Sequence, residues 1–460
     1  MAVTPNVILH LGVGSFHRAH QAVYLHELIK SGDTGWSITG GNIRPDMADT
    51  MAALAAQNGE FTLETVSPQG ERSYERITSI RKIIPFEPGL AGLIAEGADP
   101  STKIISFTVT EAGYYLDPKN KLDLSFADLV SDLDGKTMGT IYGAITAILK
   151  ERAKRGGGPV TLMNCDNLRS NGERFHSGLV DFLERRGDAD LLAWVAANTK
   201  CPSAMVDRIT PRPLPDVAER VKAATGWDDK APVMAERFIQ WVIEDHFASD
   251  WPAWEKVGAE MVESVVPYEE AKIRVLNATH SCFAWAGTLK GLLYIHEDTQ
   301  VPAIEKMAYD YVTQDVIPAL TPCPLDLAKY RDVVLDRFSN PYLQDTNQRV
   351  AMDGFSKIPG FIVPTFRDRL GQGGSIDATA MLPALYFAFL GRWHRGELAY
   401  AYQDQAMDPA AAHAYFEAAD PIGAFLKEPL LWGPLLGNEA LGNAIRAAYA
   451  RVQGFIDAKA

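Results

Sequence analysis

Cysteine is scarce in this 460-residue chain, and a long hydrophobic run is missing. The cysteines are far apart and form no CxxC pair: Cys165, Cys201, Cys282 and Cys323. That spacing argues against both a zinc cage and a disulfide framework, so we expect no metal and a reducing, cytoplasmic location. The apolar run at the N-terminus is only as long as a strand, far below the roughly 20 residues of a membrane span, and neither a basic leader nor a cleavage site accompanies it.

A concentrated basic region is also missing. Lys and Arg number 44 against 58 Asp and Glu, which gives a formal net charge of -14. This charge repels phosphate groups, so neither nucleic acid nor an anionic membrane is an expected partner. The densest basic run, residues 150–155, is interpreted as the solvated end of a helix. The sequence gives no indication of the number of subunits, and it is compatible with a monomer.

The length and the order of the apolar segments predict two domains. A chain of 460 residues exceeds what one core usually organises. In the first half, β-rich runs alternate with helical stretches, which is typical of a parallel sheet covered on both faces. From about Tyr268 onward the pattern is helical. We expect an α/β, Rossmann-type doubly wound sheet in residues 1–265 and a mainly α-helical domain in residues 266–460, because Pro267 disfavours helix in the residue before it.

Periodicity and turn signals predict the elements of the first domain. Strands are expected over residues 6–14, 36–43, 103–110 and 160–165, and helices over residues 16–32, 51–57 and 140–156. The order from residue 103 to residue 167 indicates a βαβ unit. Residues 61–68 and 75–84 alternate apolar and polar side chains around a PQGER turn, which predicts an antiparallel hairpin appended to the main sheet.

A glycine-rich turn follows the first predicted strand and opens a helix. Glycines in this place allow the backbone to turn tightly and to approach a pyrophosphate, which the N–H groups at the positive helix end then hold. The turn predicts a dinucleotide-binding site at Gly12, Gly14, Ser15 and Phe16. The third glycine of the GxGxxG pattern is replaced by His17, so a plain turn between strand and helix is the alternative.

In dinucleotide folds an acidic residue beyond the second strand binds the ribose hydroxyls of the adenosine. The candidate here is Asp46 in GGNIRPDM. Its charge disfavours the extra phosphate of NADP, so we expect NAD as the cofactor. Two other interpretations are open: Asp46 caps the following helix, or Arg44 offers a partner for that phosphate.

The segment EEAKIRVLNATH, residues 269–280, carries the most informative polar pattern. At about 100° per helical residue, four of its polar side chains fall within an arc of roughly 140°, in the order Lys272, Glu269, His280 and Asn277. A solvated helix face normally repeats Lys and Glu, whereas this stripe mixes four polar types and runs into the apolar CFAWAG. The stripe predicts side chains that face one cavity, with a solvated face as the alternative.

Such a cluster suits the oxidation of an alcohol, in which the hydroxyl proton leaves before or with the hydride. Burial lowers the pKa of a lysine from about 10.4, which makes a neutral amine accessible near working pH. Lys272 is therefore the candidate general base. Asn277 is placed to donate an N–H to the developing alkoxide, and His280 to orient a hydroxyl.

Six segments in a fixed order resemble the polyol-specific long-chain dehydrogenases, the mannitol dehydrogenase family. They are LGVGSFHRAHQAVYLHELI, FTVTEAGYY, NCDN, MVDRITP, KIRVLNATHS and RFSNPYLQDTNQRVAMDGFSKIP, and they span nearly the whole chain. The resemblance implies that Lys272 is the general base, with Asn277 and His280 completing the K-x-x-x-x-N-x-x-H motif. It also implies that Asn167 joins the oxyanion site and that Glu269 passes the proton towards solvent.

The same resemblance implies residues that contact the substrate. Arg349 and Lys357 match positions that bind substrate hydroxyls. Asp207 matches a carboxylate near the site, although a packing carboxylate paired with Arg208 is the alternative. Glu111 of TVTEAGYY receives no role.

The resemblance implies an NAD-dependent, metal-independent oxidation of a secondary hydroxyl of a sugar alcohol to a ketose. The expected reaction is D-arabinitol to D-xylulose, with D-mannitol to D-fructose as a close substitute, because one hydroxyl configuration changes only a few hydrogen bonds. Two alternatives remain. One is a reductase of keto-uronates such as fructuronate or tagaturonate, in which Arg349 or Lys357 pairs with the extra carboxylate; the other is a non-catalytic NAD-binding sensor.

Overall fold

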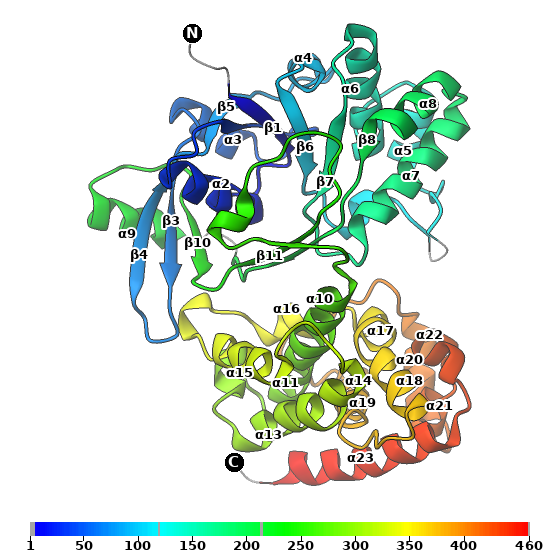
Figure 1. Ribbon diagram of the computed structural model, residues 1–460. Coiled ribbons are helices and arrows are strands. Elements are labelled where there is room, and N and C mark those ends of the chain that lie inside the picture. Colours follow the sequence, from blue (N-terminus) through cyan, green and yellow to red (C-terminus); the bar gives the residue numbers. More distant parts are fainter. Residues whose placement is uncertain (1–4, 118–119, 212–214, 459–460) are drawn as a thin grey trace. The chain divides into compact units, whose positions relative to one another are not determined.

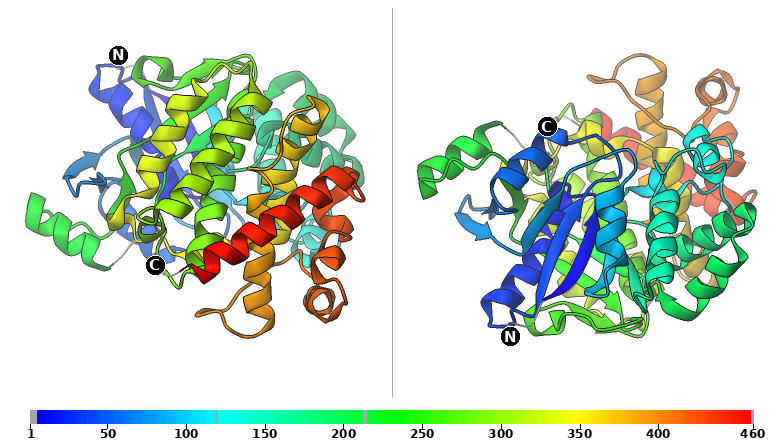
Figure 2. Two further views of the ribbon diagram at one scale, coloured as in Figure 1. Left: turned by 90° about the horizontal axis from the view of Figure 1, so that it is seen from below. Right: turned by 90° about the horizontal axis from the view of Figure 1, so that it is seen from above.

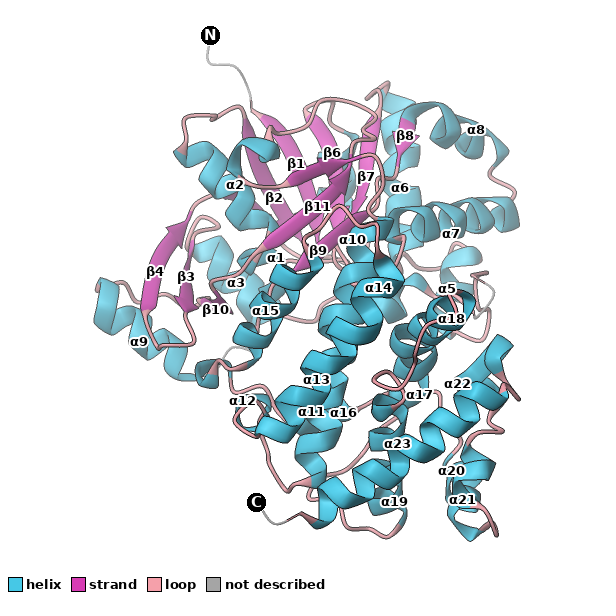
Figure 3. Ribbon diagram, turned by 60° about the horizontal axis from the view of Figure 1, so that its bottom comes forward, coloured by secondary structure: helices cyan, strands magenta, loops and turns pink. Residues whose placement is uncertain are grey.

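The computed structural model describes residues 5–117, 120–211 and 215–458, and the chain divides into two compact units. Unit 1 comprises the chain up to Ser67 together with Glu71–Val266. Unit 2 comprises Pro68–Gly70 and the chain from Pro267 onward. Strands gather in unit 1, whereas helices make up unit 2 (Figures 1 and 3), so the predicted fold class is confirmed.

Unit 1 is built around a six-stranded parallel sheet in the order β5-β2-β1-β6-β7-β8. The strands are β1 (Asn6–Leu11), β2 (Trp36–Gly41), β5 (Ile80–Ile84), β6 (Thr102–Phe107), β7 (Val160–Asn164) and β8 (Thr199–Lys200). The chain runs outward from β1 to β2 and β5, then returns to build β6, β7 and β8 on the other side. The strand order therefore reverses between β1 and β6, where doubly wound folds bind ligands.

Alternate residues of each strand point into two different cores, as the pleat of a strand requires. Ile8 and Ile104 join one core, and their neighbours Leu9 and Ile105 join the other. The helices that cover the sheet are α2 (Gln21–Lys30), α3 (Ala48–Ala56), α4 (Ala91–Ala98), α5 (Ala127–Leu133), α6 (Ile141–Arg155), α7 (Asn171–Arg186) and α8 (Ala189–Asn198). Since both faces are covered, the strands are continuous apolar runs, which is why the sequence revealed them. The predicted βαβ unit is β6, α6 and β7.

The predicted hairpin forms, but the prediction that it is appended to the main sheet was wrong. β3 (Phe61–Val66) and β4 (Arg72–Ile77) pair antiparallel in a separate sheet with β10 (Val233–Glu236). The run 75–84 is two strands, because the chain breaks at Thr78 and Ser79. The Thr78 N–H donates to His26 Nδ1, and the Ser79 hydroxyl donates to the Ala22 carbonyl, both on α2. After this break, the chain continues as β5, which joins the main sheet and pairs with β2.

The first predicted helix is also two helices, α1 (Ser15–Ala19) and α2, because His20 has non-helical φ and ψ of -128° and -87°. The rest of unit 1 is a third sheet and short helices. They are β9 (Ala204–Asp207), β11 (Gln240–Glu244), β12 (Glu260–Val262), α9 (Pro215–Thr225) and the 3-10 turns η1 (Glu111–Tyr114) and η2 (Trp254–Val257).

Unit 2 is helical around one core of its own. Its longer helices are α11 (Ala278–Leu289), α13 (Pro302–Asp310), α15 (Leu327–Phe338), α18 (Val363–Gly371), α19 (Met381–His394), α20 (Pro409–Glu417) and α23 (Glu439–Asp457). The shorter ones are α10 (Val266–Ala271), α12 (Ile295–Asp298), α14 (Ile317–Leu320), α16 (Asn347–Ala351), α17 (Gly354–Lys357), α21 (Pro421–Phe425) and α22 (Pro429–Trp432), with 3-10 turns η5 (Pro341–Leu343) and η7 (Gly433–Leu435). The long helix α23 packs against α19 (Figure 2). In the described ranges, no helix combines the length and apolarity that crossing a bilayer needs.

Within the described residues of unit 2, three π-helical segments interrupt the helices. They are η3 (Lys272–Asn277), η4 (Tyr311–Val316) and η6 (Ile358–Ile362), and η3 packs against both of the others. In such a segment each backbone bond spans five residues; the Ala278 N–H, for example, donates to the Ile273 carbonyl. π-helices are rare and concentrate at functional sites, so this cluster indicates a functional region at the start of α11.

Candidate active site

The glycine turn directly follows β1. Gly12 has φ +101°, and a Cβ there would lie 2.3 Å from the Thr108 carbonyl oxygen, so only glycine fits. At Gly14 a Cβ would meet no atom nearer than 3.9 Å, which leaves space over the turn. The Asn42 side chain, at the end of β2, accepts from the Val13 N–H at 2.9 Å. The turn is therefore fixed from within the fold and open where a phosphate group would approach.

An imidazole stack lies beside this turn, at the position where GxGxxG has its third glycine. The buried rings of His17 and His10 stack with centroids 3.4 Å apart. His10 Nδ1 lies 2.8 Å from Ser106 Oγ, and its Nε2 lies 3.2 Å from the Gly12 carbonyl. Burial lowers the pKa of His10 to about 3, so the ring is neutral. The flat ring of His17 thus provides the close helix–strand packing that a glycine provides elsewhere.

The loop after β2 carries the predicted ribose residue. Asp46 is exposed, and the N-cap of α3 is Met47, so the structure does not favour Asp46 as the cap of that helix. Arg44 donates to Asp128 Oδ2 at 2.7 Å and to the Tyr115 hydroxyl at 2.5 Å. The positive charge of Arg44 is therefore paired within unit 1.

A buried carboxylate that the sequence did not single out organises the carboxyl ends of β6 and β7. Asp166 accepts hydrogen bonds from the N–H groups of Val109 and Thr110 and from the Tyr114 hydroxyl. Burial raises its pKa to about 6, although these bonds oppose the shift. Thr110 has φ +63°, a strained conformation for a β-branched residue. The carboxylate holds this strained loop in place.

Six of the predicted site residues of unit 1 follow the carboxyl ends of parallel strands, and so lie at one edge of the sheet. They are Gly12, Gly14, Ser15 and Phe16 after β1, Asp46 after β2 and Asn167 after β7. Asn167 is exposed, as is Glu111 after β6. Asp207 is buried and ends β9 in a different sheet. Its neighbour Arg208 donates to the backbone carbonyls of Glu236 and Ala19.

The predicted base lies in unit 2, at the first residue of the π-helix. Lys272 is 7% exposed, and Glu269, three residues earlier on α10, is 5% exposed. Neither side chain belongs to a solvated face, so that alternative is wrong. Asn277 is five residues after Lys272, which is about one turn of a π-helix. His280 follows Asn277 by three residues, about one turn of an α-helix. Compared with a regular α-helix, the π-helix aligns Lys272 more closely with Asn277.

His280 is linked to two further residues of unit 2 through Asp345. Its Nε2 lies 3.1 Å from Asp345 Oδ2, and Arg349 donates to both carboxylate oxygens from Nε at 2.7 Å and from Nη2 at 2.6 Å. Lys357 Nζ donates to the Val350 carbonyl at 2.6 Å. Burial lowers the pKa of Lys357 to about 8, and burial together with the charges of Arg349 and Lys357 lowers that of His280.

The structure therefore brings His280, Arg349 and Lys357 into one charged cluster. It also shows three functional candidates that the sequence analysis missed: Asn42, Asp166 and Asp345. Asp345 and Asp166 lie in loops, where no periodicity marks a residue. The sequence signal that could have indicated Asp345 is its position four residues before Arg349 in LQDTNQR.

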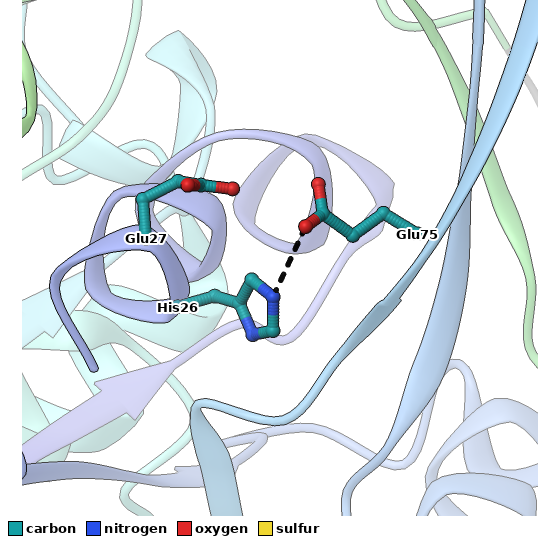
Figure 4. Close-up of side chains that lie close together, drawn as sticks. All are labelled: His26, Glu27 and Glu75. Atoms are coloured by element: carbon teal, nitrogen blue, oxygen red, sulfur yellow. Dashed lines mark ion pairs between the residues drawn. The ribbon is translucent and has the colours of Figure 1, made fainter. Parts of the chain in front are cut away.

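One group in the described part of the chain has the composition of a metal site. His26, Glu27 and Glu75 each present a ligand atom, within 4.8 Å of one another (Figure 4). Lys30 already occupies the group, since its Nζ lies 2.5 Å from Glu75 and 3.5 Å from Glu27. This ammonium pairs with the carboxylates where a cation would bind, so the group is an ion-pair cluster.

Comparisons with known proteins match nearly the whole length of the chain. The Mannitol dehydrogenase Rossmann domain matches residues 6–256, and the Mannitol dehydrogenase C-terminal domain matches residues 264–453. D-arabinitol 4-dehydrogenase of Ralstonia nicotianae is 61% identical over 98% of this chain and 97% of its own length. D-arabinitol 4-dehydrogenase of Klebsiella pneumoniae is 56% identical over 98% of each chain. The solved mannitol 2-dehydrogenase of Pseudomonas fluorescens, a ternary complex with NAD and D-mannitol, is 33% identical with a TM-score of 0.84 and covers 99% of this chain and 94% of its own.

Proposed function

The chain belongs to the mannitol dehydrogenase family, and we propose that it oxidises D-arabinitol to D-xylulose with NAD as the hydride acceptor. The observation that supports D-arabinitol as the substrate is the 61% identity to a D-arabinitol 4-dehydrogenase over nearly the full length of both chains. D-Mannitol is the expected second substrate, because alditols that differ at one carbon differ in only a few hydrogen bonds.

Unit 1 fits NAD. When bound, NAD supplies the acceptor for the hydride that leaves the carbinol carbon. Gly14 leaves room over the turn for a pyrophosphate, and we assign Gly12, Gly14, Ser15 and Phe16 to that group. We assign Asp46 to the ribose hydroxyls. Arg44, the residue that would favour NADP, is already paired with Asp128, which supports NAD.

Unit 2 supplies the proton acceptor. We assign Lys272 as the general base: its Nζ takes the hydroxyl proton while the C–H bond releases the hydride and the C=O bond forms. The side chain of Lys272 is buried at the start of the π-helix, and a positioned amine can act as a general base. Glu269, also buried, is assigned to pass this proton to solvent.

Two amides stabilise the developing alkoxide in this proposal, Asn277 and Asn167. The Oδ1 of Asn277 is buried and has no donor in the described part of the chain. Buried amide oxygens are rarely left unpaired, and an alditol hydroxyl is a suitable donor. The N–H groups of the same amide then donate to the substrate oxygen as negative charge develops.

The remaining hydroxyls are assigned to His280, Asp207, Arg349 and Lys357. In unit 2, Asp345 neutralises Arg349 by a two-bond pair, so Arg349 is not a free cation. A carboxylated ketose needs an unpaired cation, whereas a neutral alditol does not. The pairing of Arg349 removes one of the two cations that a keto-uronate could use, and so supports a polyol.

The test is a panel of substrates with NAD. We expect NADH formation with D-arabinitol, slower formation with D-mannitol, and no NADH from NAD alone. D-Xylulose and fructuronate, each offered with NADH, separate the two enzymatic alternatives. A preference for the uronate, or NAD binding without turnover of any alditol, would overturn the proposal.

A further inference from the structure

Asp345 lies in the loop between η5 and α16, and its side chain is 11% exposed. It contacts His280 with one oxygen and receives both donors of Arg349. Burial alone would raise the pKa of this carboxyl, but the bonds and charges of His280 and Arg349 hold it well below its usual value. Asp345 is therefore a carboxylate at any working pH.

The ring of His280 is held in two ways. Its plane stacks on Phe338, with centroids 4.4 Å apart and 19° between the planes. Its Nε2 faces Asp345. Burial, with the positive charges of Arg349 and Lys357, keeps the imidazole neutral by lowering its pKa, although Asp345 opposes this. A neutral imidazole that faces a carboxylate has its proton on the facing nitrogen, because two acceptors repel each other.

We propose that Asp345 is a positioning residue that fixes His280 as the Nε2–H tautomer, so that Nδ1 is the nitrogen that accepts a hydrogen bond from a polyol hydroxyl. His280 Nε2 is fully buried, and Asp345 Oδ2, at 3.1 Å, is the acceptor that we assign to it. The identity of the substrate in this inference rests on the proposed function. The tautomer of His280 does not.

This assignment gives Arg349 a second task. Its guanidinium binds the carboxylate through two parallel bonds, a rigid geometry that fixes where the oxygens point. Arg349 thus holds Asp345, and Asp345 holds His280.

A purely structural role for Asp345 is the competing explanation, since it precedes the N-terminus of α16 and its carbonyl accepts from the Ile295 N–H.

The tautomer is measured directly by NMR on protein labelled with 15N in its histidines. The His280 signal is the one that the His280→Gln variant lacks. We expect the Nε2–H pattern of 15N shifts in the unaltered protein. In Asp345→Asn we expect a mixture of tautomers or the Nδ1–H form, because an amide can either donate or accept. Arg349→Gln, which keeps the carboxylate, should retain Nε2–H.

A matched control removes the same kind of ion pair without a histidine. Asp181 pairs with Arg185 four residues on, at 2.7 Å, in unit 1. Asp181→Asn should leave the His280 signal unchanged. A proton on Nδ1 of His280 in the unaltered protein, or the same tautomer in Asp345→Asn, would overturn the proposal. These outcomes do not depend on turnover, so a failure of the proposed function is recognised separately, by the alditol panel.

Kinetics separate positioning from structure. In Asp345→Asn we expect kcat/KM for D-arabinitol to fall about tenfold or more, which corresponds to the loss of one hydrogen bond at the substrate. The KM for NAD should stay within twofold. A structural role would instead lower the melting temperature and change both KM values together, and that result would contradict the assignment.

Discussion

At the scale of single residues, the two glycines of the dinucleotide turn differ in the contacts that an added side chain would make. In Gly12→Ala the Cβ would meet the Thr108 carbonyl at 2.3 Å in a left-handed conformation. We expect the free energy of unfolding to fall by about 1–3 kcal/mol. Gly14→Ala adds a methyl group whose nearest neighbour, the Gly12 carbonyl oxygen, is 3.9 Å away, so stability should hold while the Kd for NAD rises about tenfold. Urea denaturation and NAD titration of both variants measure the difference, and equal behaviour of the two would contradict it.

Lys272→Met tests the general base. The side chain keeps its length but cannot accept a proton, so we expect kcat to fall by about 10²–10⁴-fold with the KM for NAD little changed. Lys290→Met is the control, because Lys290 follows α11 and donates to the Ala458 carbonyl. NADH formation and NAD titration give the two quantities. Activity of Lys272→Met near that of the control would rule out the assignment.

At the scale of elements, Asp166 makes the loop after β6 sensitive to pH. Its folded pKa is about 6 against an ordinary 3.8. Between these values the folded state binds more protons than the unfolded state, so the free energy of unfolding falls as pH rises from about 4 to about 6. The full effect is on the order of 3 kcal/mol, present as stability below that window and lost above it.

Urea denaturation of Asp166→Asn across this range checks the effect. The variant should lose this part of the pH dependence, whereas Asp181→Asn, on the nearby α7, should keep it. An unchanged slope in Asp166→Asn would mean that another group causes it.

The π-helix η3 provides a second test at this scale. Deleting Val275 should convert the segment to a regular α-helix, since a π turn contains one extra residue. Lys272 and Asn277 would then be four residues apart in an α register, and the buried side chain of Val275 would be lost from the packing around them. We expect circular dichroism to stay helical and kcat to fall at least 10²-fold. Deleting Thr313 from η4 is the matched control, and an equal loss there would remove the special role of η3.

The elements show why part of the fold was predictable. β1, β2, β6 and β7 were found because residues buried on both faces form continuous apolar runs. The break at Thr78 and Ser79 was not found, although these two adjacent polar residues interrupt the alternation between Ile77 and Ile80. The π-helices were missed because apolar periodicity averages over several turns and does not register one added residue.

For the candidate site, the sequence offered a pattern only where chemistry and helical spacing coincide. Lys272, Asn277 and His280 share one helical run, so their spacing carried information. Asp345 and Asp166 act from loops on partners distant in sequence, and no local pattern records such contacts. Conversely, the sequence suggested Arg349 as a substrate ligand without its partner Asp345, which changes the charge that a substrate would meet.

At the scale of the whole molecule, the two units have separate hydrophobic cores. The cores of unit 1 contain no residue after Met261, and that of unit 2 begins at Ala271. A unit with its own core can fold alone. We expect the chain ending at Val266 to unfold cooperatively and to bind NAD with a Kd within tenfold of that of the full chain, because the assigned dinucleotide residues all belong to unit 1. It should not oxidise D-arabinitol, since Lys272 is absent. Calorimetry and NAD titration measure both properties, with Gly14→Ala in the same fragment as the control that should weaken binding. A folded fragment without affinity for NAD would show that residues of unit 2 take part in holding the cofactor.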